Sequence, residues 1–439
     1  MRILVIGSGA REHALAWKLA TSTTATEVLC APGNPGMESI ARCLPVKASD
    51  LGGLAEVAIR ERIDLTVVGP EQPLADGIVD AFTAKGLRIF GPSRAASRLE
   101  WSKAFAKEFM ARHGIPTSAS VTFRSDEGDA ARRYIRTCPL PVVIKADGLA
   151  AGKGVIICAT RAEAESGITQ MFDARVFGTA GSAVVIEEFM TGTEASVFAV
   201  ADGEHYCLLA PAQDHKRAFD DDRGKNTGGM GAFAPTPFVS EPLLRTVEES
   251  IVRPTLRGMA EDGHPYRGCL YVGLMLTAHG PKVVEYNCRF GDPETQVVLP
   301  LYAGDFAELL AGAADGRIVT SRPAPSVRGS AVCVVLASEG YPDSYPTGRE
   351  IRGLDAVGGL QDIVVFHAGT KREGGRLVTA GGRVLGVTAV APAQTIERAI
   401  GRVYEAVGMI SFEGMHYRRD IGRRAVREAR GGVIHPPKG

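Results

Sequence analysis

The sequence has no excess of positive or negative charge, no long apolar run and no closely spaced cysteines. Its 50 Lys and Arg residues balance its 50 Asp and Glu residues, which makes it a poor candidate for a nucleic-acid-binding or membrane-surface protein. The apolar stretch near the N-terminus ends at Ile6, and no later run approaches the ~20 apolar residues of a membrane span. We therefore expect no nucleic-acid partner, no membrane and a cytoplasmic location.

The eight cysteines are scattered, with at least thirteen positions between neighbours, and none lies in a C-x-x-C pair. This spacing excludes the common zinc and redox motifs, so we expect reduced and mostly buried thiols. Glycine, in contrast, is abundant and clustered, with 52 residues in 439. Clustered glycines predict several backbone loops that approach a ligand closely.

Length and local pattern predict about three domains. Residues 1 to about 100 alternate short apolar runs, glycine turns and helical segments, which is typical of an open parallel α/β sheet with its ligand at the carboxyl ends of the strands. A helix capped by Ser102, burying Phe105, Phe109 and Met110, begins the next region. The stretch 321–330, rich in Pro, Ser and Arg, is predicted to be a linker to a small α+β domain. The predicted division is 1–102, 103–325, 326–430 and a tail at 431–439.

The first glycine turn, Gly7-Ser8-Gly9-Ala10-Arg11-Glu12, resembles a dinucleotide-binding fingerprint but departs from it. Glu12 occupies the sixth position of G-x-G-x-x-G, where an acidic side chain would crowd a pyrophosphate. The turn therefore predicts a site for a small anionic or polar ligand beside Arg11, or else only a tight turn.

The stretch from Lys145 to Val155 places one lysine on a strand end and a second, Lys153, in a glycine-rich loop. Such a loop can fold its amides over a triphosphate. It is not a P-loop, because Gly154 follows Lys153 where Ser or Thr is required, and a simple hairpin is the alternative.

Glu285, Asn287 and Arg289 alternate along a predicted strand and should share one face. A carboxylate and an amide are oxygen ligands that suit Mg²⁺ bridging phosphates, and a guanidinium can contact phosphate in a fork. The alternative is the exposed polar face of an edge strand.

Two further segments carry weaker signals. Glu187-Glu188-Phe189 follows an apolar strand and could pair with a purine edge, with Glu194 near a ribose hydroxyl, although a solvated strand end gives the same pattern. Residues 218–231, which follow Asp214-His215-Lys216-Arg217, form a charged, glycine-rich stretch that we expect to be a mobile lid or substrate loop. We expect its three consecutive aspartates, at 220–222, to be solvated rather than metal-binding.

Motifs along nearly the whole chain resemble the glycinamide ribonucleotide synthetase family, phosphoribosylamine–glycine ligases of the ATP-grasp superfamily. The stretches that carry the resemblance are GSGAREHALAWKL, APGNPG, VVGPEQPLADGIVD, IFGPSRAASRLEWSKAFAKEFMARHGIPT, VIKADGLAAGKGV, EEFMTGTEAS, QDHKR, NTGGMGAFAPTP, EYNCRFGDPETQ and FHAGTK. The chain departs from the family pattern at Ala10, Trp101 and Lys225. None of the three lies among the residues proposed for ATP or metal.

The resemblance implies an N-terminal acceptor-substrate domain, a central ATP-grasp domain with a lid at about 120–192, and a small C-terminal domain. It implies that glycine attacks the γ-phosphate of ATP to give glycyl phosphate, and that the amine of 5-phosphoribosylamine then displaces phosphate. The implied nucleotide-binding residues are Lys103, Lys145, Gly148, Gly152, Lys153, Gly154, Glu187, Glu188, Phe189 and Glu194.

The remaining roles are also implied by the resemblance. Glu285 and Asn287 match the family's ligands for Mg²⁺ or Mn²⁺, and Arg289 would stabilise the transferred phosphoryl group. Asp214 and Lys216 would lie near glycine and the acyl phosphate. The residues implied for phosphoribosylamine are Gly9, Arg11, Asn34, Gly291, Asp292, Pro293, Glu294 and Thr295.

Two alternatives share parts of this pattern. Another ATP-grasp carboxylate ligase would keep the ATP and metal residues but activate bicarbonate or formate. A non-catalytic nucleotide-binding module would bind ATP without glycine-dependent turnover. The neutral net charge and the lack of heptads permit a monomer, which is our expectation.

Overall fold

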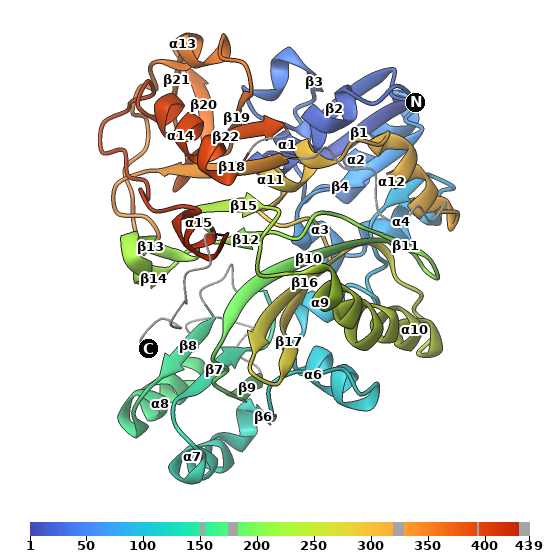
Figure 1. Ribbon diagram of the computed structural model, residues 1–439. Coiled ribbons are helices and arrows are strands. Elements are labelled where there is room, and N and C mark those ends of the chain that lie inside the picture. Colours follow the sequence, from blue (N-terminus) through green and yellow to red (C-terminus); the bar gives the residue numbers. More distant parts are fainter. Residues whose placement is uncertain (150–153, 174–182, 319–328, 393–394, 430–439) are drawn as a thin grey trace.

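The computed structural model describes residues 1–149, 154–173, 183–318, 329–392 and 395–429, and these form three regions along the chain (Figure 1). Gly152, Lys153, the tail at 431–439 and most of the predicted linker lie outside the described residues. The last two linker positions, Gly329 and Ser330, begin strand β18 instead. Among the described residues, no helix is long and apolar enough to cross a membrane.

The N-terminal region is a parallel five-stranded sheet in the order β3-β2-β1-β4-β5. Ile3 and Val5 of β1 point into one apolar core and Leu4 and Ile6 into the other, so both faces of the strand are buried. This confirms the predicted open α/β sheet. The elements are β1 Arg2–Gly7, α1 Ala10–Ala20, β2 Glu27–Pro32, β3 Arg42–Cys43, α2 Leu51–Arg60, β4 Leu65–Val68, α3 Glu71–Ala75, α4 Ile78–Thr83 and β5 Ile89–Phe90.

Two helices lead out of this sheet, α5 (Arg98–Trp101) and α6 (Lys103–Arg112). The Ser102 hydroxyl caps α6 by accepting a hydrogen bond from the amide of Phe105, as predicted. Phe109 and Met110 are buried, but the prediction for Phe105 is wrong. Its half-buried ring packs against the edge of the apolar core and lies under the Arg98 guanidinium, which is 4.1 Å from the ring centre.

A small antiparallel sheet in the order β6-β9-β7-β8 projects from the rest of the molecule (Figure 1). Its strands are β6 Ser120–Arg124, β7 Val142–Ala146, β8 Val155–Cys158 and β9 Ala183–Glu188, and it has a core of its own. Two helices pack on it, α7 (Gly128–Thr137) and α8 (Arg161–Ile168), the latter continuing as a π-helical turn over Thr169–Asp173. Helix α7, whose buried side chains are Ala131 and Ile135, was not predicted from the sequence.

The central region contains the sheet β11-β10-β16-β17, with β10 Thr193–Asp202, β11 Tyr206–Leu208, β16 Arg267–Thr277 and β17 Gly280–Asn287. Its helices are α9 Glu241–Val247, α10 Arg253–Glu261, α11 Thr295–Val298 and α12 Phe306–Asp315. The segment predicted as a long loop is more regular than expected. It follows β12 Gln213–Asp214, contains the hairpin β13 Arg217–Phe219 with β14 Arg223–Asn226, and leads into β15 Gly231–Ala234.

A second five-stranded sheet, β12-β15-β18-β22-β19, joins the central and C-terminal regions. β15 pairs with β18 (Gly329–Ala337), which pairs with β22 (Arg383–Pro392), and β19 (Ile363–His367) forms the edge. Helix α14 (Ile396–Val407) packs on β18 and β22 (Figure 1). The remaining elements are α13 Leu354–Gly358, the hairpin β20 Thr370–Glu373 with β21 Arg376–Thr379, and α15 Arg423–Ala429.

Candidate active site

Lys145, at the end of β7, shares a buried carboxylate with a second lysine. Its Nζ lies 2.9 Å from Glu187 Oε1 on β9, while Lys107 Nζ on α6 lies 3.1 Å from Glu187 Oε2. Burial would raise the pKa of Glu187, but the charges of the two lysines outweigh it and leave the pKa below its usual value. Burial also lowers the pKa of Lys107 to about 8. Lys107 had no sequence signal, because its partner lies eighty positions further along the chain.

Lys103 lies at the start of α6 and binds the loop that follows β7. Its Nζ donates to the Gly148 carbonyl at 2.9 Å, and the amide of Ala104 donates to Asp147 Oδ1 at 3.0 Å. Across the same loop, the Ala146 amide donates to the Gly154 carbonyl at 2.8 Å. Glu188 is exposed and Phe189 half-buried beyond them, at the end of β9. The contacts therefore bring Lys103 together with Gly148 and Lys145 together with Glu187.

Glu285 and Asn287 lie on β17, opposite Gly273 and Tyr271 of β16. The two strands approach closely here, since a Cβ added at Gly273 would lie 3.3 Å from Glu285 Cγ. Lys145 Nζ donates to the carbonyl of Val284, which precedes Glu285, at 3.2 Å. No group of three His, Cys, Asp or Glu side chains in the described ranges could hold a metal, so an ion here would need further oxygen ligands from water or phosphate.

Arg289 follows β17 and is held by two carboxylates from the N-terminal region and α5. Its Nε lies 3.3 Å from Glu71 Oε2 and its Nη2 lies 3.0 Å from Glu100 Oε1. Burial raises the pKa of Glu100, whereas Arg289 and Arg11 outweigh the effect of burial on Glu71 and hold its pKa at about 2. Neither acid was among the predicted site residues, because each lies far from Arg289 in the sequence.

Lys216 joins two of the predicted residues. Its Nζ lies 2.9 Å from Asp214 Oδ1 and 2.8 Å from Glu194 Oε2, so the carboxylate predicted for a ribose already has a partner. These two charges raise the pKa of Lys216 well above its usual value although burial opposes them. Nearby, Glu294 Oε1 accepts a hydrogen bond from the Tyr271 hydroxyl at 3.0 Å. Burial, aided by the charge of Asp214, raises the pKa of Glu294 to about 7.

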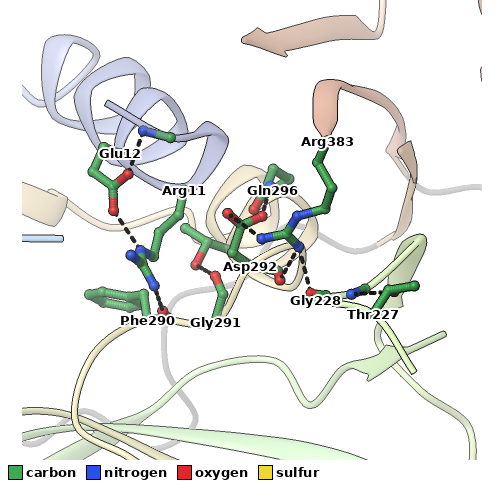
Figure 2. Close-up of polar contacts among 12 residues, drawn as sticks. Arg11, Glu12, Thr227, Gly228, Phe290, Gly291, Asp292, Gln296 and Arg383 are labelled. Carbon is green, nitrogen blue, oxygen red and sulfur yellow. Dashed lines mark hydrogen bonds and ion pairs between the residues drawn. The ribbon is translucent and has the colours of Figure 1, made fainter. Parts of the chain in front are cut away.

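The first glycine turn, at residues 7–12, is occupied by the side chain of its last residue, Glu12. Glu12 accepts hydrogen bonds from the Gly9 amide and from Arg11 Nε, both at 2.6 Å, and Arg11 Nη1 donates to the Phe290 carbonyl at 3.3 Å (Figure 2). A Cβ added at Gly69 would lie 2.3 Å from Glu12. The carboxylate thus takes an amide that a dinucleotide pyrophosphate would need, in line with the interpretation from sequence.

Arg383, at the start of β22, connects three segments and was not predicted. Figure 2 shows it reaching from the C-terminal region toward Asp292 and Gly228. Its Nη1 donates to the Gly228 carbonyl at 2.5 Å and to the Asp292 carbonyl at 2.7 Å, and its Nη2 lies 3.2 Å from Asp292 Oδ2. Burial would raise the pKa of Asp292, but Arg383 and Arg11 lower it overall.

The loop that carries Asp292 is braced on both sides. Gln296 Nε2 donates to Asp292 Oδ1 at 2.7 Å, and the Thr295 hydroxyl donates to the Gly291 carbonyl. Pro293 lies against Gly229, where an added Cβ would be 2.4 Å from its Cδ. The predicted residues 291–295 therefore form one rigid turn.

Asn34 links the first glycine turn to the C-terminal region. Its Nδ2 donates to the carbonyls of Ser8 and His367, each at 2.8 Å. The His367 amide donates to Nδ1 of His13 at 2.9 Å, and its own Nδ1 lies 3.1 Å from the Thr370 hydroxyl. Both rings lie against Gly36, where a Cβ would meet them at 2.4 and 2.6 Å.

This histidine contact predicts a loss of stability in mild acid. Burial lowers the pKa of His13 to about 3 and that of His367 to about 4, from 6.5, so below pH 6.5 the unfolded chain binds protons that the folded chain excludes. His367→Gln should lessen the fall in unfolding free energy between pH 6 and 4 by roughly 1 kcal/mol per pH unit. Urea unfolding at pH 7, 6, 5 and 4 measures this slope. The exposed His279→Gln serves as the control, and equal slopes in both variants would contradict the expectation.

Comparisons with known proteins identify the same enzyme family. Models of the N, ATP-grasp (A) and C domains of phosphoribosylglycinamide synthetase match residues 1–100, 101–295 and 331–424. The phosphoribosylamine–glycine ligase of Chlorobaculum tepidum is 51% identical over 430 residues, covering 97% of this chain and 100% of the relative. That of Caulobacter vibrioides is 50% identical over 429 residues, covering 98% and 99%.

Solved structures give the same result. The crystal structure of the phosphoribosylamine–glycine ligase of Thermotoga maritima superposes with a TM-score of 0.83 at 36% identity, covering 96% of this chain and 100% of that one. The biotin carboxylase domain of Hydrogenobacter thermophilus 2-oxoglutarate carboxylase has a TM-score of 0.72 at 18% identity, covering 95% and 91%. At that identity the second match shows a shared fold alone.

Proposed function

The chain belongs to the phosphoribosylglycinamide synthetase family, and from this membership we propose that it joins glycine to 5-phosphoribosylamine at the expense of ATP. The products are glycinamide ribonucleotide, ADP and phosphate, in purine biosynthesis. In this reaction glycine first takes the γ-phosphoryl group to become glycyl phosphate. The amine of phosphoribosylamine then attacks the glycyl carbon, and phosphate leaves.

One observation supports the phosphoryl-transfer step most directly. The hydrogen bond from Lys145 to the Val284 carbonyl puts a cation beside the strand that carries Glu285 and Asn287. Lys103 and Lys145 would bind phosphate oxygens, with Gly148, Gly152, Lys153 and Gly154 supplying the loop around them. Glu285 and Asn287 would hold a divalent cation, Mg²⁺ or Mn²⁺, which offsets phosphate charge when bound. Phosphoryl transfer depends chiefly on such positioning and charge neutralisation.

The other residues divide among the nucleoside of ATP, glycine and phosphoribosylamine. The residues Glu187, Glu188 and Phe189 would contact adenine and Glu194 the ribose, for which Glu194 must exchange its contact with Lys216. Asp214 and Lys216 would orient glycine, and Arg289, fixed by its two carboxylates, would stabilise the acyl phosphate. The phosphoribosylamine site would comprise Gly9, Arg11, Asn34, Gly291, Asp292, Pro293, Glu294 and Thr295.

The decisive experiment measures ADP release with Mg·ATP while glycine and phosphoribosylamine generated in situ are supplied separately and together. Turnover that needs both supports the proposal. Turnover with bicarbonate or formate in place of glycine would assign the chain to a different carboxylate ligase. ATP binding without turnover under any of these conditions would leave only a nucleotide-binding protein.

Substituting Lys107 should weaken the binding of ATP and leave the binding of glycine unchanged. With Lys107→Met, Glu187 keeps Lys145 as its one cationic partner and holds that lysine back from phosphate. We expect the KM for ATP to rise roughly tenfold, equivalent to about 1.4 kcal/mol, while the KM for glycine stays unchanged. Initial-rate kinetics with each substrate varied measures both, and Lys85→Met, at an exposed lysine, is the control. An increase confined to the KM for glycine would contradict this role.

A further inference from the structure

Two of the eight cysteines, thirteen positions apart in the sequence, lie side by side in the fold. Strands β2 and β3 run parallel, and their register places Cys30 directly opposite Cys43. Both side chains lie against Gly33, since an added Cβ there would be 2.4 Å from Cys43 Sγ and 3.1 Å from Cys30 Cβ. The pairing arises from strand register, so cysteine spacing in the sequence does not reveal it.

The two thiols have different surroundings. Cys30 is fully buried in the apolar core, whereas Cys43 is half-buried on β3, the two-residue strand at the edge of the sheet. The interaction between the two neighbouring side chains raises the pKa of Cys30 well above its usual value and lowers the pKa of Cys43. The nucleophilic thiolate therefore forms at Cys43, the more accessible sulfur, and Cys30 stays protonated behind it.

Cys43 is also coupled to the first glycine turn. Its Sγ lies 3.9 Å from the carbonyl of Asn34, whose side-chain amide binds the carbonyls of Ser8 and His367. The preceding residue, Gly33, has φ +73°, and its amide donates to the Gly7 carbonyl at 3.1 Å. A change of bonding at Cys43 thus acts directly on the residues that hold this turn to the C-terminal region.

We propose that Cys43 and Cys30 form a thiol modification site that reacts with hydrogen peroxide. The Cys43 thiolate attacks one peroxide oxygen, the O–O bond breaks, and Cys43 sulfenic acid and hydroxide form. The Cys30 sulfur then attacks Cys43 sulfur, the S–O bond breaks, and hydroxide leaves and takes the Cys30 proton as water. Two thiols supply two electrons, one peroxide accepts them, and a dithiol reductant reverses the reaction.

The disulfide requires the two Cβ atoms to approach to about 3.8 Å. A two-residue edge strand can shift toward its neighbour to allow this, and a disulfide leaves Cys43 without the S–H that faces the Asn34 carbonyl. We expect oxidation to weaken binding at the first glycine turn. This consequence rests on the proposed function, whereas disulfide formation itself does not.

Peptide mapping of the full chain after peroxide treatment tests the chemistry independently of activity. Trypsin cleaves after Arg42 and Lys47, so Cys30 and Cys43 fall in separate peptides, Leu19–Arg42 and Cys43–Lys47. We expect these two to be linked after oxidation and separated again by dithiothreitol. Cys43→Ser should abolish the link between the peptides. Cys30→Ser or Cys30→Ala should leave a sulfenic acid at Cys43 that dimedone traps. The control Cys207→Ser, at a cysteine in the core, should behave as the parent. Absence of the linked peptide, or equal linkage of other cysteine pairs, would overturn the site.

Kinetics of the oxidised parent then test the coupling. We expect the KM for phosphoribosylamine to rise roughly tenfold, about 1.4 kcal/mol, with the KM for ATP unchanged and full recovery after reduction. Cys43→Ser should show no such response to peroxide. A linked peptide with an unchanged KM for the amine would overturn the coupling to the turn. A chain that releases no ADP even when reduced would instead show that the proposed function has failed, while the peptide map still decides the modification.

Discussion

Glu285→Ala should abolish glycine-dependent ADP release. The side chain is half-buried on β17, beside the carbonyl that binds Lys145, and no neighbouring carboxylate on that strand can replace it. A metal ion at phosphate supplies several kcal/mol of transition-state charge stabilisation, so its loss should lower kcat by roughly a thousandfold or more. Steady-state ADP release at saturating ATP, glycine and phosphoribosylamine measures the effect.

The controls separate metal loss from unfolding. Glu285→Gln keeps the shape and one oxygen ligand but removes the charge, so its residual activity should increase with added Mn²⁺, whereas that of Glu285→Ala should not. Glu241→Ala removes an exposed acid on α9 and should leave turnover unchanged. If Glu285→Ala retained kcat within tenfold of the parent, the proposed metal site would be in the wrong place.

Arg383→Ala should displace two segments at once, the one that contains Gly228 and the loop that carries Asp292. The guanidinium binds the carbonyl of Gly228, which directly follows Thr227, whose hydroxyl donates to the Lys216 carbonyl. It also neutralises Asp292. Removing it leaves a partly buried carboxylate without its cation, which should cost on the order of 3 kcal/mol of stability. Displacement of both loops should also lower kcat by about a hundredfold, since misplacement of reacting groups by about 1 Å has that effect.

Rescue experiments distinguish positioning from a general loss of stability. Arg383→Lys cannot bind two carbonyls and a carboxylate together, so it should recover little activity, whereas free guanidinium should partly restore Arg383→Ala. The KM for ATP should not change, because the two lysines proposed to bind phosphate make different contacts. Lys103 binds Gly148, and Lys145 binds Glu187 and Val284. Arg376→Ala, at an exposed arginine of β21, is the control. Failure of guanidinium to restore any activity, together with a raised KM for ATP, would contradict a positioning role.

Local pattern predicted the parts of the molecule that a short stretch determines. The parallel sheet followed from apolar runs ending in glycine turns, and the cap at Ser102 followed from one hydroxyl before an apolar helix. Lys145, Glu285 and Asn287 were singled out by spacing along predicted strands, and the structure connects the two strands through Lys145. Their roles in binding nucleotide and metal stay predictions.

Contacts between segments that lie far apart along the chain could not be predicted from the sequence. Arg383 meets Asp292 across 91 positions, and the buried Arg418 pairs with Asp222 across 196. That pair fixes a segment that we expected to be a mobile loop. The Asp220 carboxylate, which accepts a hydrogen bond from the Arg419 amide, holds the same segment. Helix α7, which buries Ala131 and Ile135, was also not predicted.

The sheet shared by the central and C-terminal regions affects how the chain can be divided. β18 has β15 on one side and β22 on the other, so the C-terminal quarter of the chain completes a sheet that begins about a hundred residues earlier. A fragment ending before β18 would expose the ladder of β15, and a fragment beginning there would expose that of β18, each an open edge prone to aggregation. These two regions should therefore melt in one cooperative transition, and cutting the chain between them should destabilise both.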